Sequence, residues 1–165
     1  MKHWKIRSTI KEITIALVLL FIVSQLISYI RAPDLGSNQL PQINATLIDG
    51  TTFSTRKGKP LLIHFWAISC PACKLEAPNI ETVSKEYDVL TIAVNSGSDE
   101  AVRTYMKEHG LDFNVLNDRD GVWSKKFKIE VFPTTFIYDA KGTLRFTEVG
   151  YTTTAGLLAR LEWIE

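Results

Sequence analysis

The sequence predicts an α/β domain with a mixed central sheet flanked by helices, preceded by one transmembrane helix. Three observations support this prediction. A stretch of 18 residues without a charge lies near the N-terminus, at 13–30. Two later apolar runs, 60–67 and 89–95, have the length and composition of strands buried on both faces. Segments with helical periodicity alternate with these runs, as in an α/β fold.

The composition limits the class of protein. The chain has 165 residues, of which 45% are apolar and 22% charged, and two of them are cysteines. This length suits one domain, and the apolar content argues against a disordered chain. Two cysteines are too few for a disulfide-stapled mini-protein or a four-cysteine zinc site, but they suffice for one redox couple. The net charge of +1 argues against a nucleic-acid partner.

The charge-free segment, Ile13 to Ile30, is predicted to be a signal anchor. As a helix, it would be about 27 Å long, close to the roughly 30 Å of a bilayer's hydrocarbon core. A cleaved signal peptide is the alternative, but the apolar stretch exceeds the usual length and no A-x-A-like site follows it. The first 31 residues carry a charge of +4 and the remainder −3. By the positive-inside rule, residues 1–12 are therefore predicted to be cytoplasmic and the C-terminal domain to lie outside.

A predicted linker at 31–40 follows the anchor, because this segment contains Pro, Gly, Ser and Asn without apolar periodicity. The remaining segment, 41–165, has the size of one domain. It begins with a predicted β-hairpin, since an Asp-Gly pair at 49–50 separates two short strands at 43–47 and 51–54.

Helices and strands then alternate along the domain. The segment 98–109 is predicted to be a helix, with Ser98 as its N-cap and Gly110 at its end. The other predicted elements are strands at 60–67, 89–95, 134–138 and 144–149 and helices at 71–87, 121–127 and 154–164. This order places Cys70 at a junction between a strand and a helix.

The motif Cys70-Pro71-Ala72-Cys73 is the predicted reactive centre. Two cysteines three apart on a first helical turn bring their Cα atoms to roughly the 4.4 to 6.8 Å that a disulfide needs. Unpaired N–H groups at the helix N-terminus stabilise a thiolate, so Cys70 is predicted to be the nucleophile. Cys73 lies one turn in and would be the resolving thiol. Pro71 suits the first helical position, and no cofactor beyond the redox-active disulfide is expected.

A CxxC pair is also compatible with functions other than redox exchange. A metal site needs further ligands, and the predicted domain offers only His64 and His109, so no metal is expected. A copper-binding or copper-delivery module is the alternative function, because paired thiolates select Cu(I). That class usually adds a Met or His beside the pair. A thiol peroxidase would have Thr or Ser three residues before the reactive cysteine, where this chain has Ala67.

Two segments resemble the thioredoxin superfamily, namely LLIHFWAISCPACKLEAP at 61–78 and VFPTTFIYDAKG at 131–142. Within it, they are most similar to the membrane-tethered TlpA-like thiol-disulfide oxidoreductases, over essentially 41–165. The resemblance implies a thioredoxin-like fold and exchange of disulfides with extracytoplasmic protein thiols. It also implies a reductant role, a periplasmic domain on a bacterial inner membrane, and a transmembrane thiol reductant as electron donor.

By the same resemblance, Phe132-Pro133-Thr134 is the family's cis-proline loop, which faces the redox pair. Only X-Pro bonds adopt the cis form at small cost. Without an N–H of its own, Pro133 leaves neighbouring backbone groups free to pair with an extended substrate. The resemblance further implies that Pro133 keeps metal from the thiolates and that Phe132 tunes reduction potential and substrate fit. The alternative is an ordinary proline at the start of a strand.

The surroundings of the cysteine pair add further candidate residues. The resemblance implies that Trp66, four residues before Cys70, packs under the active site. Members of the family often carry Trp directly before the first cysteine, where this chain has Ser69. That difference removes an aromatic wall from the rim. We expect Trp66, Pro71 and Ala72 to contribute to substrate binding together with the cis-proline loop.

Two titratable residues are candidate proton acceptors. Glu76 follows Cys73 by three residues on the predicted helix, and in cytochrome-maturation relatives a Glu at this position could take the proton of the buried thiol. The alternative for Glu76 is a solvated surface residue. His64 occupies the strand position where thioredoxins carry a buried acid, and its ordinary pKa of about 6.5 suits a proton shuttle. The alternative for His64 is a hydrogen-bonded core residue.

Overall fold

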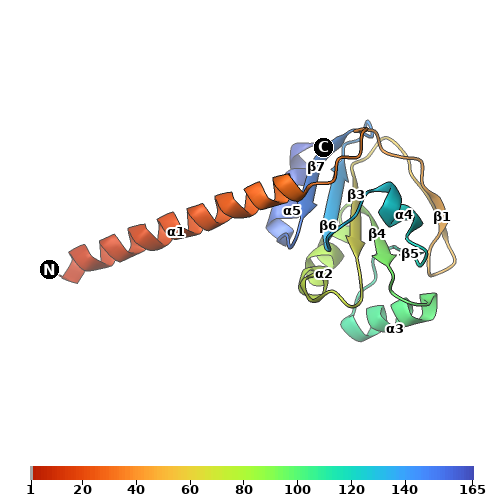
Figure 1. Cartoon of the computed structure of the whole chain (residues 1–165), viewed down its shortest axis with the longest axis horizontal. Coiled ribbons are helices and arrows are strands. Elements are labelled where there is room, and N and C mark those ends of the chain that lie inside the picture. Colours follow the sequence, from red (N-terminus) through yellow and green to blue (C-terminus); the bar gives the residue numbers. More distant parts are fainter. Residues whose placement is uncertain (1) are drawn as a thin grey trace.

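The computed structural model describes residues 2–165, with side chains from residue 11 onward. Its first element is the single long helix α1 (Lys2–Arg31), which projects away from a separate α/β domain (Figure 1). By length and composition, its part from Lys11 to Arg31, with a mean hydropathy of 2.4, could cross a membrane. Met1, the first residue of the predicted cytoplasmic segment 1–12, lies outside the described residues.

The predicted hairpin is confirmed. Strands β1 (Asn44–Thr46) and β2 (Thr52–Ser54) pair antiparallel, with Ala45 opposite Phe53. At the turn, the Asp49 carboxylate accepts the N–H of Thr51 at 2.9 Å. The hairpin forms a two-stranded sheet separate from the central one.

The central sheet has five strands in the order β5-β4-β3-β6-β7. Strands β3, β4 and β5 run parallel, and β6 and β7 are antiparallel to their neighbours. The strands are β3 (Leu61–Trp66), β4 (Asp88–Val94), β5 (Val115–Asp118), β6 (Thr134–Tyr138) and β7 (Leu144–Val149). The mixed sheet was predicted, but β5 was not. Its four residues include Asn117 and Asp118, so it lacks both a long apolar run and a clear alternation.

Helices cover both faces of this sheet. They are α2 (Pro71–Ser84), α3 (Asp99–His109), α4 (Val122–Lys126) and α5 (Thr154–Trp163). Leu62 and Trp66 of β3 join a core cluster with residues of α2, α3 and α5. The alternate residues Ile63 and Phe65 join a second cluster that includes Phe127, directly after α4, and residues of the hairpin segment. Period-2 alternation in a strand thus separates the core into two layers.

The second half of the predicted linker at 31–40 pairs with the domain. The N–H of Leu40 donates to the carbonyl of Gly142 at 2.7 Å, and the N–H of Leu144 donates to the carbonyl of Asn38 at 2.7 Å. Leu35 and Leu40 also pack against the second core cluster. The segment joins the domain because the outer side of an edge strand presents unpaired backbone groups that favour a partner.

Candidate active site

A short loop connects the carboxyl end of β3 to the start of α2, and Cys70 is the last residue of this loop. It is the N-cap of that helix, and its Sγ accepts the N–H of Cys73 at 3.1 Å. The loop is fixed because the N–H of Ile68 donates to the hydroxyl of Ser96, beyond the end of β4, at 3.1 Å. Cys70 and Cys73 form a disulfide with their Cα atoms 5.3 Å apart, within the range expected from the sequence.

The two sulfurs differ in access. Cys73 is 2% exposed and belongs to the core cluster, whereas Cys70 is half-buried. Pro71, at the first helical position, is exposed beside them. An incoming thiolate can therefore approach Cys70 and not Cys73. Attack on Cys70 breaks the S–S bond and releases the Cys73 sulfur. In the reduced form, the helix N-terminus favours negative charge on the Cys70 sulfur.

The Phe132–Pro133 peptide bond is cis. Strand β6 pairs antiparallel with β3, and Phe65 lies opposite Thr134. Pro133 is therefore beside Trp66, at the end of β3 from which the cysteine loop departs. Phe132 is half-buried and packs against the same core cluster as Cys70 and Cys73. The fold thus brings the two predicted motifs together from segments about sixty residues apart.

Trp66 lies under the site. It is 3% exposed, and its ring packs on Tyr105 and Phe113 with centroid distances of 5.5 and 6.1 Å. A side chain so deeply buried offers no surface to a substrate, so Trp66 supports the cysteine pair from below. The exposed positions at the rim are Ser69 and Pro71, with Ala72 half-buried.

Glu76 is buried on the inner side of α2. Its side chain is 0% exposed, and its Oε1 accepts the N–H of Thr152 at 3.2 Å, while Oε2 has no hydrogen-bond partner among the described residues. Burial raises the pKa of Glu76 to about 8, against the lowering effect of the Thr152 bond, and the charge of Glu148 adds to the rise. A solvated position is thereby excluded. Near neutral pH, such a carboxyl group can take up or release a proton.

His64 lies in the middle of β3, where it is flanked by Thr91 on β4 and Thr135 on β6. It is 2% exposed, and its Nδ1 is 2.9 Å from the hydroxyl of Thr135. Burial lowers the pKa of His64 to about 3, so the ring is neutral at physiological pH. This arrangement corresponds to the hydrogen-bonded core residue and not to a proton shuttle titrating near pH 6.5.

Residues that the sequence did not single out also shape the site. Ser96 holds the loop before Cys70, and Thr152 provides the one hydrogen bond seen at Glu76 among the described residues. Neither stands in a recognisable motif, because each acts on a segment that is distant along the chain. Within the described part of the chain, no group of three or more His, Cys, Asp or Glu is placed to hold a metal ion.

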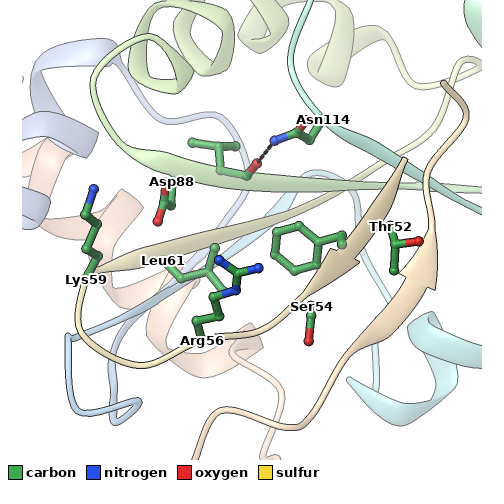
Figure 2. Close-up of a pocket in the computed structure, with 9 residues that line it drawn as sticks. Thr52, Ser54, Arg56, Lys59, Leu61, Asp88 and Asn114 are labelled. Carbon is green, nitrogen blue, oxygen red and sulfur yellow. Dashed lines mark hydrogen bonds between the residues drawn. The ribbon is translucent and has the colours of Figure 1, made fainter. Parts of the chain in front are cut away.

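A separate hollow lies at the other end of the sheet. This cavity has a volume of about 210 Å³. Figure 2 shows its lining, which includes residues of β2, Arg56 and Lys59, and the first residues of β3 and β4, Leu61 and Asp88. Cys70 follows the opposite, carboxyl end of β3. The cavity is therefore not part of the redox site.

Comparisons with known proteins agree with this geometry. Residues 35–161 match the Redoxin family model. The chain is 30% identical to a thioredoxin-like protein of Haemophilus influenzae over 98% of both sequences. It is 32% identical to the thiol-disulfide oxidoreductase ResA of Oceanobacillus iheyensis, over 84% of this chain and 77% of that protein. A secreted disulfide oxidoreductase of Mycobacterium tuberculosis superposes with a TM-score of 0.66 and 28% identity, covering 74% of this chain and 96% of that structure.

Proposed function

This chain belongs to the Redoxin family and is a thioredoxin-like thiol-disulfide oxidoreductase, and we propose that it reduces protein disulfides outside the cytoplasm while α1 holds it at the membrane. The observation that carries the proposal is the asymmetry of the pair. Cys70 is accessible at a helix N-terminus, and Cys73 is enclosed behind it. Together they provide an attacking thiol and a resolving thiol.

The reaction starts from the dithiol form. The Cys70 thiolate attacks a substrate disulfide, forms a mixed disulfide and releases one substrate thiolate, which takes up a proton. Cys73 then loses its proton, attacks the Cys70 Sγ and releases the second substrate thiolate. Two electrons pass to the substrate, and the Cys70–Cys73 disulfide remains, which is the form described above. The cis-proline loop binds the substrate backbone during the attack.

Glu76 is our candidate acceptor for the Cys73 proton. It lies one helical turn beyond Cys73, is buried with it, and has one carboxylate oxygen without a partner in the described residues. Because its pKa is raised to about 8, near neutral pH, Glu76 can both accept a proton and release it again. The Thr152 N–H favours the carboxylate form, which is the form that accepts a proton.

The proposed membrane attachment keeps the domain close to a membrane-embedded electron donor. The periplasm is oxidising, so a reductant there must be reduced again by a donor that carries electrons across the membrane. We infer that this donor is a transmembrane thiol reductant. The basic residues before the charge-free segment 13–30 support a single-pass anchor in a bacterial inner membrane, and the secreted relative supports a domain in the periplasm.

A more specific role, in copper tolerance, is suggested by sequence segments that are less distinctive than the CxxC motif. The anchor end Arg31-Ala32-Pro33 and the segments 91–102 and 113–135 resemble the suppressor-of-copper-sensitivity protein D group. We therefore infer a link to copper tolerance, with cytochrome maturation as the other pathway class among these relatives. Copper titration separates this role from the alternative of a copper-delivery module. Tight stoichiometric Cu(I) binding without turnover of a disulfide substrate would favour the module.

Trapping tests the proposed function. A full-length Cys73→Ser variant should accumulate mixed disulfides through Cys70, because the resolving step is removed. Captured proteins, identified by mass spectrometry, would include both substrates and the membrane donor. Cys70→Ser is the matched control and should capture nothing. If the Cys73→Ser variant captures nothing although Cys70 reacts with alkylating reagents, the assignment as an oxidoreductase of protein substrates fails.

A further inference from the structure

Asn79 ties α2 to the segment between β7 and α5. Its Nδ2 donates to the carbonyl of Thr152 at 2.9 Å and to the hydroxyl of Tyr151 at 3.1 Å. Its Oδ1 accepts the hydroxyl of Thr154 at 3.0 Å. A single side chain thus contacts three residues that are more than seventy positions away in the sequence.

The same segment provides the hydrogen bond at Glu76. The N–H of Thr152 donates to Glu76 Oε1, and the carbonyl of Thr152 accepts from Asn79, one helical turn further along α2. Thr152 is therefore held to α2 through both of its backbone polar groups. If the carbonyl were released, the N–H would lose the constraint that directs it at the carboxylate.

We propose that Asn79 is a positioning residue for Glu76, because its amide clamps the 151–154 segment onto α2 and so keeps the Thr152 N–H directed at the carboxylate. The inference rests on the proposed role of Glu76 as proton acceptor and adds the residue that sets its protonation. The hydrogen bonds of the Asn79 side chain go to Tyr151, Thr152 and Thr154. Asn79 acts through Thr152.

The hydrogen bond from the Thr152 N–H is the main interaction that stabilises a negative charge on the buried Glu76 carboxylate. The charged and titratable groups on the neighbouring elements do not replace it. Glu148 on β7 opposes ionisation of Glu76, but its own carboxylate is paired with Arg160 of α5 at 2.7 Å. His64 on β3 is neutral and bonded to Thr135. On α2 itself, Cys73 is in the disulfide. The residues of β4 in the core cluster beside α2, Val89 and Ala93, carry no charge.

The clamp is needed because the segment has few other attachments. Tyr151 is 52% exposed. On its other side, the segment borders a cavity of about 220 Å³ that is also lined by Phe21, Ser24 and Ser28 of α1. Among the described residues, the segment is also attached by the Gly150 N–H, which donates to the carbonyl of Pro133, and by the start of α5. Neither of them fixes the direction of the Thr152 N–H.

The ionisation of Glu76 gives a direct test. In the oxidised full-length chain, with ¹³C-labelled Glu carboxyl groups, the Glu76 signal is followed by NMR against pH and assigned with Glu76→Gln. Asn79→Ala should raise the midpoint by about one pH unit, a tenfold change in the ionisation constant, since a hydrogen bond that favours the charged form is lost. Thr154→Val removes one of the three bonds of Asn79 and should shift the midpoint upward by less.

Thr82→Ala is the matched control. Thr82 lies one turn further along α2, and its hydroxyl donates to the carbonyl of Pro78 in the same helix, so loss of this hydroxyl should leave the midpoint unchanged. An unchanged or lowered midpoint in both Asn79→Ala and Thr154→Val would overturn the inference. If Asn79→Ala raises the midpoint while Glu76→Gln leaves the pH dependence of disulfide exchange unaltered, the clamp stands and the proton-acceptor role of Glu76 fails.

Discussion

The hydroxyl of Ser28 in α1 accepts the backbone N–H of Val149 at the end of β7, at 2.9 Å. Ser28 is 7% exposed, whereas the large apolar side chains around it in α1 remain open. Ser24, Gln25 and Ser28 all border the cavity of about 220 Å³ that lies between α1 and the end of β7. The last turns of α1 thus direct polar side chains at the edge strand and apolar ones away from the domain. In a membrane, this division separates a protein-facing side from a lipid-facing side.

Replacing Ser28 should loosen this contact. In Ser28→Ala, the Val149 N–H loses its partner, and its amide hydrogen exchange should become at least about tenfold faster, the equivalent of roughly 1.4 kcal/mol. The measurement is hydrogen exchange on the full chain in nanodiscs. Protection of the β3 amides serves as the internal control and should not change. Unaltered exchange at Val149 would mean that α1 and the domain move independently in the bilayer.

Glu76 should make the protein less stable as the pH rises. Its folded-state pKa of about 8 lies above the usual value near 4.5, so the folded state binds more protons between these limits. The relative stabilisation is full below pH 4.5 and is lost as the pH rises through about 8, at up to roughly 1.4 kcal/mol per unit. Chemical denaturation at a series of pH values should show this slope. Glu76→Gln should flatten it; an equal slope in the variant would contradict the burial of Glu76.

His64 should have the opposite effect at low pH. Its folded-state pKa of about 3 lies below the ordinary 6.5, so the unfolded chain takes up the proton first. Stability is full above pH 6.5 and falls as the pH drops from there toward 3. Denaturation curves at pH 7 and pH 5 should differ by about 2 kcal/mol from this residue alone. His64→Gln should reduce that difference, whereas a proton shuttle titrating near 6.5 would contribute none.

The two thiols of the reduced protein should react at very different rates. Cys70 is half-buried at a helix N-terminus and Cys73 is 2% exposed, so iodoacetamide at pH 7 should modify Cys70 at least about tenfold faster. Peptide mass spectrometry after short exposure gives both rates. Cys70→Ser provides the rate of Cys73 alone. Equal modification of the two residues would remove the structural basis for assigning attack to Cys70.

The orientation in the membrane is tested by proteolysis. With α1 as a retained anchor and the basic N-terminus inside, protease added to spheroplasts should digest the C-terminal domain. A cytoplasmic protein in the same sample is the control for intact membranes. Protection of the domain until the membranes are lysed would reverse the proposed topology.

Local patterns predicted most of this architecture, and long-range contacts account for the rest. The capping by Ser98 and Gly110, the hairpin and the order around Cys70 depend on neighbouring residues, and they were predicted correctly. The burial of Glu76 was left open because it depends on Thr152, 76 positions later.

Two segments adopt a conformation that the local sequence does not predict, for the same physical reason. The segment 38–40 reads as a linker in isolation, yet it pairs with residues next to β7. Strand β5 is short and polar, and it exists because β4 offers it a parallel edge. In both cases, the partner strand, and not the local sequence, decides the conformation.

Because residues 38–40 pair with the domain, the linker between α1 and the domain is short. Only about six residues, 32–37, lie between the end of α1 and the first paired residue, and Leu35 among them packs against the second core cluster. Fully extended, six residues span at most about 20 Å. With α1 in a membrane, as we propose, a domain on so short a connection searches for membrane partners in two dimensions and at a high effective concentration near the bilayer. It would meet a membrane-embedded donor far more often than a dissolved protein of equal abundance. Lengthening this linker should therefore slow re-reduction of the Cys70–Cys73 disulfide before it slows attack on soluble substrates.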